Sequence, residues 1–235
     1  MNKDLFISEL NKLNIKVTEK ELLLLNDYFN FLKEYNSHTN LTRIIEEENV
    51  YLKHFYDSLT IVKSIDLNAI DNLLDIGSGA GFPGIVIKIF FPHLNITLLD
   101  SNNKKTAFLR KCCDLLNLDN VTVINDRAEK FIINNREKFD LVTSRAVASL
   151  VVLSELSIPF VKLGGYFVAL KGDLIKEVDS SFAISKLGGE VISNEEFLLP
   201  IENSVRNIIK VKKIKSSDNL FPRSYEKILK KPLIK

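Results

Sequence analysis

Five residues that could bind a nucleotide-like ligand lie within the sequence DIGSGAGFPG at residues 75 to 84. They are Asp75 and the four glycines Gly77, Gly79, Gly81 and Gly84. Glycine permits a tight turn and lets a ligand approach the backbone, and a proline suits the first turn of a helix. The apolar run LLDI at 73–76 comes directly before the glycines. The pattern therefore predicts a strand, a ligand-binding turn in which Gly79 and Gly81 allow backbone approach, and a helix.

The class of ligand is a separate question. Residues 79–84 satisfy the G-x-G-x-x-G pattern of dinucleotide-binding folds, and Asp100 ends the next apolar run, where a carboxylate can accept hydrogen bonds from both hydroxyls of a ribose. NAD and S-adenosylmethionine both carry that ribose. Asp75, expected to face the amino-acid end of the ligand, and the absence of a second substrate domain favour S-adenosylmethionine. The alternative for Asp75 is a turn or helix-capping carboxylate.

The end of the fourth expected strand should border the reaction site, because ligands of open α/β sheets bind beyond the carboxyl ends of the strands. Residues 143–146, TSRA, contain no cysteine to attack a pyrimidine and no motif for holding an exocyclic amine. The acceptor is then a nucleophile that needs little activation, such as guanine N7. Arg145 could orient the base or the ligand carboxylate, or be a surface ion-pair residue. Lys171, at the end of the fifth expected strand, is a candidate phosphate contact.

Other reactive residue types have ordinary structural interpretations. His54 and Asp57 share a helical face by their three-residue spacing, and we expect His54 to be packed and hydrogen-bonded. Cys112 and Cys113 are adjacent in an expected helix and have no evident base partner. No His, Cys and carboxylate cluster indicates a metal site.

The elements that must position these residues divide the chain in two. The first 76 residues contain neither glycine nor proline, and a capping box at Thr18 and Glu21 begins a long amphipathic helix. Further helices are expected at 5–13 and 46–65, with a polar loop at 36–42 between. From residue 73, apolar runs alternate with helix-length segments, which predicts an α/β fold with a mostly parallel sheet and an antiparallel edge hairpin. The expected strands are 73–76, 96–100, 121–124, 139–144, 166–171, 190–200 and 206–213.

The charge of the chain is unevenly distributed. The 235 residues carry 32 Lys plus Arg and 30 Asp plus Glu, a net charge of +2 that at first argues against a nucleic-acid partner. Residues 206–235, however, hold ten basic and two acidic residues, 10 − 2 = +8. This basic end could hold RNA phosphates near the cleft, or be a solvated tail. We expect no membrane span and no secretory signal, and hence a cytoplasmic protein.

The motifs together resemble the glucose-inhibited division protein B family, bacterial enzymes that methylate guanine N7 in small-subunit ribosomal RNA with S-adenosylmethionine. The resemblance extends over most of the chain. It rests on these segments: NLT at 40–42, HFYDS at 54–58, the loop at 75–84, LLDS at 98–101, SRA at 144–146, ALKG at 169–172, RNII at 206–209, FPR at 221–223 and KKPL at 230–233.

The resemblance implies a Rossmann-like class I methyltransferase sheet, with the last strand antiparallel, at residues 67–235 and a helical N-terminal extension at residues 1–66. It implies donor contacts at Gly77, Phe82, Ala128, Glu129 and Arg145. The expected substrate is small-subunit ribosomal RNA or the small ribosomal subunit, with neither DNA nor a membrane as partner. Two alternatives stay open, a nicotinamide-dependent oxidoreductase and a non-catalytic RNA-binding protein.

Overall fold

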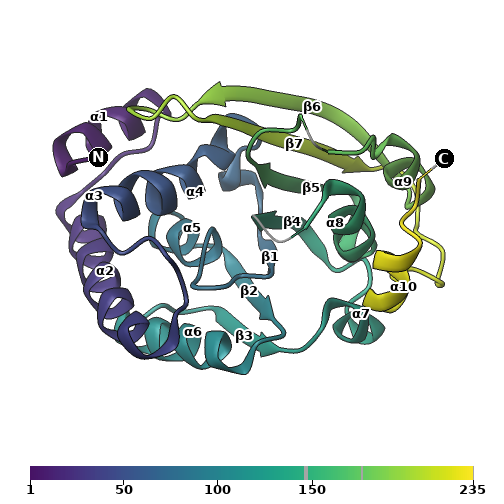
Figure 1. Cartoon of the computed structure of the whole chain (residues 1–235), viewed down its shortest axis with the longest axis horizontal. Helices are drawn as coiled ribbons and strands as arrows, with labels where there is room; N and C mark the ends of the chain where they lie inside the picture. The colour runs from purple at the N-terminus through teal and green to yellow at the C-terminus, as the bar shows by residue number, and fades with distance from the viewer. Residues whose placement is uncertain (146–147, 176, 235) are drawn as a thin grey trace.

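The computed structural model describes residues 1–145, 148–175 and 177–234. Within these residues lies a seven-stranded sheet of order β3-β2-β1-β4-β5-β7-β6 (Figure 1). Five neighbouring strands are parallel, and β7 pairs antiparallel with both β5 and β6. The strands are β1(Asn72–Ile76), β2(Asn95–Asp100), β3(Val121–Asn125), β4(Phe139–Arg145), β5(Val161–Lys171), β6(Gly189–Leu198) and β7(Val205–Lys213).

The predicted sheet is confirmed, with two differences in detail. Strand β5 begins at Val161, five residues before its expected start at residue 166. The last strand, β7, lies between β5 and β6, so the hairpin of β6 and β7 pairs with the rest of the sheet through β7, and β6 is the edge strand. Because β7 runs antiparallel, its first residues lie beside the end of β5, and Asn207 is paired with Lys171.

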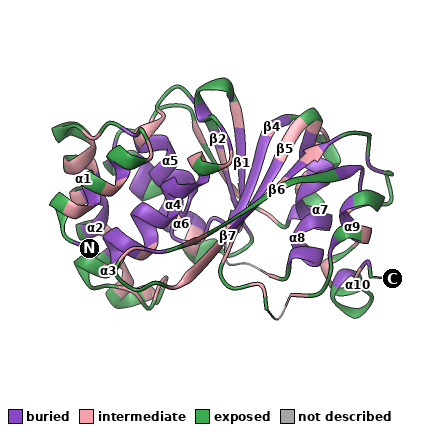
Figure 2. Cartoon of the chain, turned by 90° about the horizontal axis from the view of Figure 1, so that it is seen from above, coloured by how far each residue is buried: buried purple, intermediate pink, exposed green. Residues whose placement is uncertain are grey.

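Each face of the sheet packs against its own layer of helices (Figure 2). Side chains alternate along a strand, so neighbouring residues enter different layers. Leu73 joins the cluster formed with the N-terminal helices, α5(Gly84–Phe90) and α6(Asn103–Leu115). Leu74 joins the cluster formed with α7(Ala128–Phe131), α8(Leu150–Ser157), α9(Ser181–Lys186) and α10(Tyr225–Lys230). Leu98 and Leu99 divide in the same way. This alternation decides which strand residues can reach which layer.

The long N-terminal helix forms as expected, but it is longer. Helix α2(Glu19–Thr39) begins with the capping box of Thr18 and Glu21. The polar loop expected at 36–42 starts only at Asn40, which ends the helix in the left-handed conformation with φ 53°. Tyr35 packs against Phe108 in this last part of the helix. That contact keeps a polar stretch helical although its sequence resembles a loop.

The second expected helical region, 46–65, is confirmed as one continuous helical path over residues 47–63. Its middle, η1(Tyr51–Tyr56), has the wider turns of a π-helix, a form often found at functional sites. The elements are α3(Glu47–Val50), η1(Tyr51–Tyr56), α4(Asp57–Leu59) and η2(Thr60–Lys63), preceded in the chain by α1(Lys3–Lys12). These N-terminal helices share one apolar cluster with the sheet. The boundary between an N-terminal extension, residues 1–66, and a second domain, residues 67–235, stays a prediction.

The remaining helices connect the strands and cover both faces. They are η3(Leu67–Ala69), α5(Gly84–Phe90), α6(Asn103–Leu115), α7(Ala128–Phe131), η4(Ile132–Asn134), α8(Leu150–Ser157), η5(Ile158–Phe160), α9(Ser181–Lys186) and α10(Tyr225–Lys230). Cys112 and Cys113 are buried in α6, as expected. Among the described helices, none has the length and apolar character needed to cross a bilayer.

Candidate active site

The glycine loop begins where β1 ends and is fixed by backbone geometry. Gly77, Gly79 and Gly81 have φ of 72°, 60° and 96°, the left-handed region that side chains rarely tolerate. The amide groups of Gly77 and Ser78 both donate to the Leu99 carbonyl, at 2.7 and 3.2 Å. The loop is thereby tied to the end of β2, and its exposed backbone borders a cavity.

This first cavity has a volume of about 530 Å³ and lies beyond the carboxyl ends of β1 to β4. It lies where the strand order reverses, because β1 has β2 on one side and β4 on the other. Seven residues predicted from sequence as ligand contacts line it together. They are Gly77, Gly79, Phe82, Asp100, Ala128, Glu129 and Arg145.

Asp100 lies at the end of β2 with its carboxylate held by backbone amides. Its Oδ2 accepts a hydrogen bond from the Gly79 amide at 3.0 Å, and its Oδ1 accepts one from the Asn102 amide at 2.8 Å. Lys105 Nζ is 3.7 Å from Oδ2. An ionised carboxylate has about four acceptor sites. Asp100 can therefore still accept hydrogen bonds from ribose hydroxyls in the cavity.

Asp75 does not lie where the sequence argument placed it. Its side chain is fully buried, and Oδ2 accepts a hydrogen bond from the Gly84 amide at 3.0 Å. Its other oxygen, Oδ1, is buried without a partner among the described residues, and burial raises the pKa of this carboxyl to about 7. Strand alternation turns Asp75 toward the start of α5 and away from the cavity wall. The expected contact with the amino-acid end of a ligand is thus corrected to the helix-capping alternative.

Gly81 also serves packing and does not line the cavity. A Cβ atom at Gly81 would lie 2.5 Å from Tyr28 Oη and 2.6 Å from Ile85 Cδ1. The Tyr28 hydroxyl donates a hydrogen bond to the Ala80 carbonyl. The N-terminal helix α2 therefore supports the glycine loop directly, which local sequence could not indicate.

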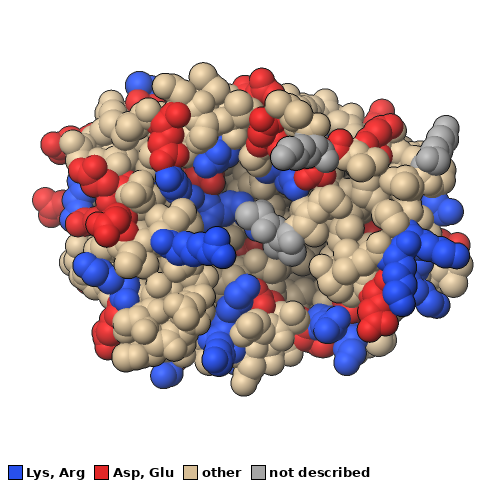
Figure 3. Space-filling model, viewed as in Figure 1, with Lys and Arg blue, Asp and Glu red and all other residues tan. Residues whose placement is uncertain are grey.

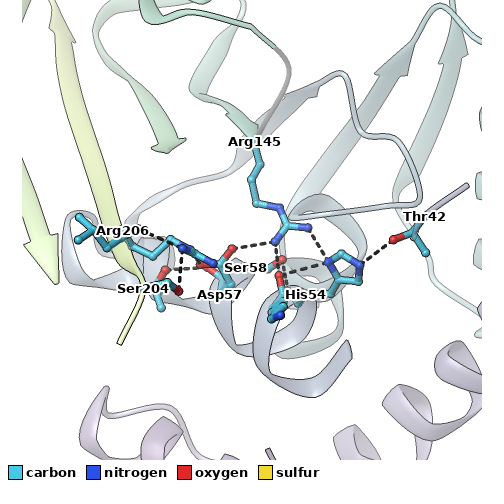
Figure 4. Close-up of polar contacts among 10 residues, drawn as sticks. Thr42, His54, Asp57, Ser58, Arg145, Ser204 and Arg206 are labelled. Atoms are coloured by element: carbon cyan, nitrogen blue, oxygen red, sulfur yellow. Dashed lines mark hydrogen bonds and ion pairs between the residues drawn. The ribbon is translucent and has the colours of Figure 1, made fainter. Parts of the chain in front are cut away.

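Arg145, at the end of β4, is held by the N-terminal helices (Figure 4). Its Nη1 donates to the Lys53 carbonyl at 2.8 Å and to Asp57 Oδ2 at 2.9 Å. The other oxygen of Asp57 accepts a hydrogen bond from Arg206 Nε at 2.9 Å. The Arg145 guanidinium also lies 5.2 Å from the ring centre of Phe82. One carboxylate thus fixes two arginines that come from β4 and β7. Ala146, expected at the same border, lies outside the described residues.

His54 is packed and hydrogen-bonded, as the sequence predicted. Its ring stacks on Phe82 with 4.2 Å between centroids, and burial, with Arg145 nearby, lowers its pKa to about 3. The Lys53 carbonyl lies 3.2 Å from His54 Nδ1, but a guanidinium can only donate, so the Arg145 Nη2 contact at 3.1 Å assigns this nitrogen as an acceptor. The ring proton then lies on Nε2, which contacts Thr42 Oγ1 at 3.1 Å. His54 is a neutral side chain with both nitrogens occupied.

Lys171 is not the free cation that the sequence argument expected. Its Nζ donates to the Ala148 carbonyl at 2.7 Å and pairs with Glu177 at 2.5 Å, and its side chain is only 11% exposed. Its charge is therefore already matched inside the protein. Lys171 lines a second cavity next to the first and does not reach the first one.

The second cavity has a volume of about 340 Å³ and shares His54 and Arg145 with the first. It lies beyond the ends of β4 and β5, beside the start of β7. Its other lining residues are Ile44, Lys53, Asp57, Thr60, Leu170, Lys171, Gly172, Phe197, Arg206, Asn207 and Ile208.

Three cations of the basic C-terminal end pair with carboxylates inside the fold. Arg206 pairs with Asp57, and Arg223 pairs with the fully buried Glu155. Lys213 is 1% exposed and donates to the Ile158 carbonyl at 3.0 Å. Arg206 and Lys213 are not part of a solvated tail, because they lie in β7 inside the sheet, and Arg223 is held by Glu155. Lys235, which was counted in the same segment, lies outside the described residues.

Basic side chains nevertheless surround the site. Figure 3 shows the face of the molecule that is seen in Figure 1. This face is hollowed near its middle, with Lys and Arg side chains at the border of the hollow. The basic residues lining the two cavities are Lys53, Lys105, Arg127, Arg145, Lys171 and Arg206.

Tyr225 is a cavity residue that sequence reasoning missed. It lies at the start of α10 and lines the first cavity, and its amide is 3.4 Å from Glu129 Oε1. Thr42 lines the same cavity and was noted only as part of a motif. No local pattern distinguishes either residue, because each reaches the site through the packing of its helix or loop.

A family model described as "GidB: rRNA small subunit methyltransferase G" matches residues 21–191. The chain belongs to this family. A relative from Bacillus subtilis (strain 168), named ribosomal RNA small subunit methyltransferase G, is 46% identical over 227 residues, 95% of each chain. A member of the rRNA small subunit methyltransferase G family from Macrococcus caseolyticus is 44% identical over the full length of both chains.

Solved structures agree with this family on the fold. A SAM-dependent methyltransferase from Aquifex aeolicus matches with a TM-score of 0.56 at 16% identity, over 74% of this chain and 97% of that one. M. jannaschii TYW2 in complex with AdoMet matches with a TM-score of 0.51 at 17% identity, over 62% of this chain and 70% of that one. At these identities the likeness concerns the fold alone, and it confirms the expected Rossmann-like methyltransferase architecture.

Proposed function

We propose that this protein transfers a methyl group from S-adenosylmethionine to N7 of a guanine in small-subunit ribosomal RNA. The observation that carries the proposal is the first cavity, where Asp100 and Arg145 lie at the ends of β2 and β4 beside the glycine loop. This arrangement occurs in a chain of the rRNA small subunit methyltransferase G family. Family and geometry thus support the same reaction.

The residues of the first cavity fit the donor in chemistry and size. Asp100 has acceptor capacity for the two ribose hydroxyls, and the backbone at Gly77 and Gly79 allows close approach. Ala128 and Glu129 follow β3, where an adenine would lie against the end of the sheet. Arg145, held rigidly by Asp57, presents its guanidinium toward the remaining end of the cavity, where it suits a carboxylate.

The chemistry requires positioning and no proton transfer by the protein. When bound, S-adenosylmethionine supplies an electrophilic methyl group on a sulfonium, and guanine N7 has a lone pair and no proton. The methyl moves from sulfur to N7, sulfur loses its positive charge, and the base ring gains it. His54 fits this scheme because its neutral ring, occupied at both nitrogens, only supports Phe82 and Arg145. The chain's contribution is alignment of the reactants and exclusion of water.

Lys105 and Arg127 line the first cavity with side chains that are 37% and 56% exposed, and they favour an RNA substrate, because Lys and Arg side chains bind phosphates without regard to sequence. We expect either the RNA or the assembled small subunit to be methylated, in the cytoplasm where ribosomes are assembled.

Incubation with labelled S-adenosylmethionine and undermethylated small-subunit RNA, or small subunits, tests the proposal. The label is expected in alkali-labile N7-methylguanine, with none on DNA of matched length. No label in guanine would overturn the proposal. Calorimetry that detects NAD binding but no S-adenosylmethionine binding would instead favour an oxidoreductase, and RNA binding without donor binding would favour a non-catalytic RNA-binding protein.

A further inference from the structure

The second cavity continues directly from the proposed donor site. The two cavities share the side chains of Arg145 and His54. The first extends from this shared wall toward β1, β2 and β3, and the second extends toward β5 and β7. A molecule in the second cavity therefore approaches the donor site from the side of Arg145, at the opposite end from Asp100.

The walls of the second cavity suit a flat heterocycle. Much of the lining is apolar and comes from Ile44, Leu170, Phe197 and Ile208. The Asn207 amide is already satisfied, since its Nδ2 donates to the Gly172 carbonyl and its Oδ1 accepts from Asn194. A cavity of about 340 Å³ that combines apolar side chains with polar groups largely paired inside the protein has the size and character of a small-molecule site.

The charges around the second cavity are nearly balanced, which argues against a phosphate as its occupant. Lys53 pairs with Glu202 at 2.5 Å, and Lys171 pairs with Glu177 at 2.5 Å. The two arginines share the single carboxylate of Asp57. Four cations therefore face three carboxylates, and a neutral polar group fits better than a phosphate dianion.

Arg206 supplies a directed donor in the second cavity. Its Nε and Nη1 are engaged by Asp57, Ser204 and the Val205 carbonyl. Among the described residues, Nη2 has no hydrogen-bond partner. This nitrogen could donate to a carbonyl oxygen such as purine O6, while the Asp57 bond holds the guanidinium plane in place.

We propose that the second cavity holds the target base, an unpaired guanine turned out of the RNA, with its ring packed on Phe197 and its O6 accepting from Arg206. This inference rests on the proposed function, because it takes methyl transfer in the first cavity as given. The atom that reacts is the one facing the wall at Arg145, which is N7, two bonds from the carbon that bears O6 and on the same edge of the purine. Enzymes that modify a base take it out of the stack and hold it by aromatic and apolar contacts.

The test compares two neighbouring residues of β6. Phe197 lines the second cavity, whereas Leu198 faces the other side of the sheet and is 56% exposed. For Phe197→Ala we expect kcat/KM for undermethylated RNA to fall about tenfold or more, because base stacking on an aromatic ring contributes about 1–3 kcal/mol. Phe197→Tyr should restore most of the activity, and Leu198→Ala should behave as the wild type.

Donor affinity, measured by calorimetry, separates this role from a general effect on the fold. It should change less than twofold in Phe197→Ala. The inference is overturned if Phe197→Ala keeps wild-type kcat/KM for RNA, or if it loses donor affinity in proportion to activity. A wild-type protein that methylates no RNA would overturn the proposed function itself, so the two failures are distinguishable.

Discussion

Asp57 and Arg145, 88 residues apart in the sequence, form an ion pair of 2.9 Å with each side chain only 12% exposed. The same carboxylate binds Arg206. This contact joins the N-terminal helices to the ends of β4 and β7. It brings the N-terminal helices to the wall of the candidate active site.

Removing this carboxylate should destabilise the protein. Asp57→Ala leaves two partly buried guanidinium groups unpaired, and breaking a buried pair typically costs about 3–5 kcal/mol. Lys12→Ala removes a lysine that is 66% exposed from its pair with Glu9, and should cost less than about 1 kcal/mol. Urea unfolding of both variants measures the difference. If both variants lost the same small amount of unfolding free energy, Asp57 would not hold the two arginines in place.

Replacing Asp100 should weaken donor binding. Asp100→Ala removes the proposed ribose acceptor and the partner of the Gly79 amide, so we expect the donor Kd to rise at least about tenfold. The exposed Asp119 provides a control, and Asp119→Ala should leave the Kd unchanged. Calorimetry with S-adenosylmethionine measures both. An unchanged Kd in Asp100→Ala would exclude Asp100 from the site.

Gly81 and Gly164 offer a matched pair, because both have positive φ but only one lacks space. A Cβ at Gly81 meets Tyr28 and Ile85, whereas a Cβ at Gly164 meets nothing within 4 Å. Gly164→Ala should cost about 1–2 kcal/mol from strain alone. Gly81→Ala adds overpacking of about 1–3 kcal/mol and should also weaken donor binding. Similar unfolding curves for the two variants would contradict the tight contact with Tyr28.

The buried Asp75 should make stability depend on pH. Its folded pKa of about 7 lies above the ordinary value of 3.8. The folded state is stabilised by binding this proton more tightly than the unfolded state does. This stabilisation is fully present below about pH 4 and is lost as pH rises through 7. Between pH 5 and 7 the wild type should therefore lose up to about 1.4 kcal/mol per pH unit relative to Asp75→Asn, which cannot ionise. Urea unfolding at several pH values would show parallel curves if Asp75 titrates normally.

We expect Lys171 to contribute nothing to RNA binding, because it forms an ion pair with Glu177 inside the protein. Its charge is matched by Glu177, so Lys171→Ala should leave the slope of log affinity against log salt unchanged. Arg127 is 3.7 Å from Glu129, a longer contact, and its side chain lines the first cavity and is 56% exposed. Arg127→Ala should lower the slope by about 0.7, the value for one contact with single-stranded RNA. Filter binding of RNA over a series of salt concentrations measures both slopes. A reduced slope in Lys171→Ala would show that Lys171 does contact a phosphate.

The sequence alone determined the strands, the glycine loop and several residues of the first cavity. These follow from local rules, because apolar runs predict strands, glycine permits left-handed turns, and parallel strands bring their carboxyl ends to one edge. Asp100 and Arg145 were found in this way, since each ends a strand. The family resemblance added donor contacts at Gly77, Phe82, Ala128 and Glu129 and favoured a site role for Arg145.

Only the tertiary structure decided the direction and the partners of the charged side chains. The pleat of β1 turned Asp75 beneath α5, and Glu177 neutralised Lys171. Three cations of the basic C-terminal end, Arg206 and Lys213 on β7 and Arg223 before α10, form internal ion pairs with Asp57, Glu137 and Glu155. Such contacts join segments that are far apart in the chain. A charge in a sequence shows that a partner is needed, but packing determines whether that partner lies in the protein or in a substrate.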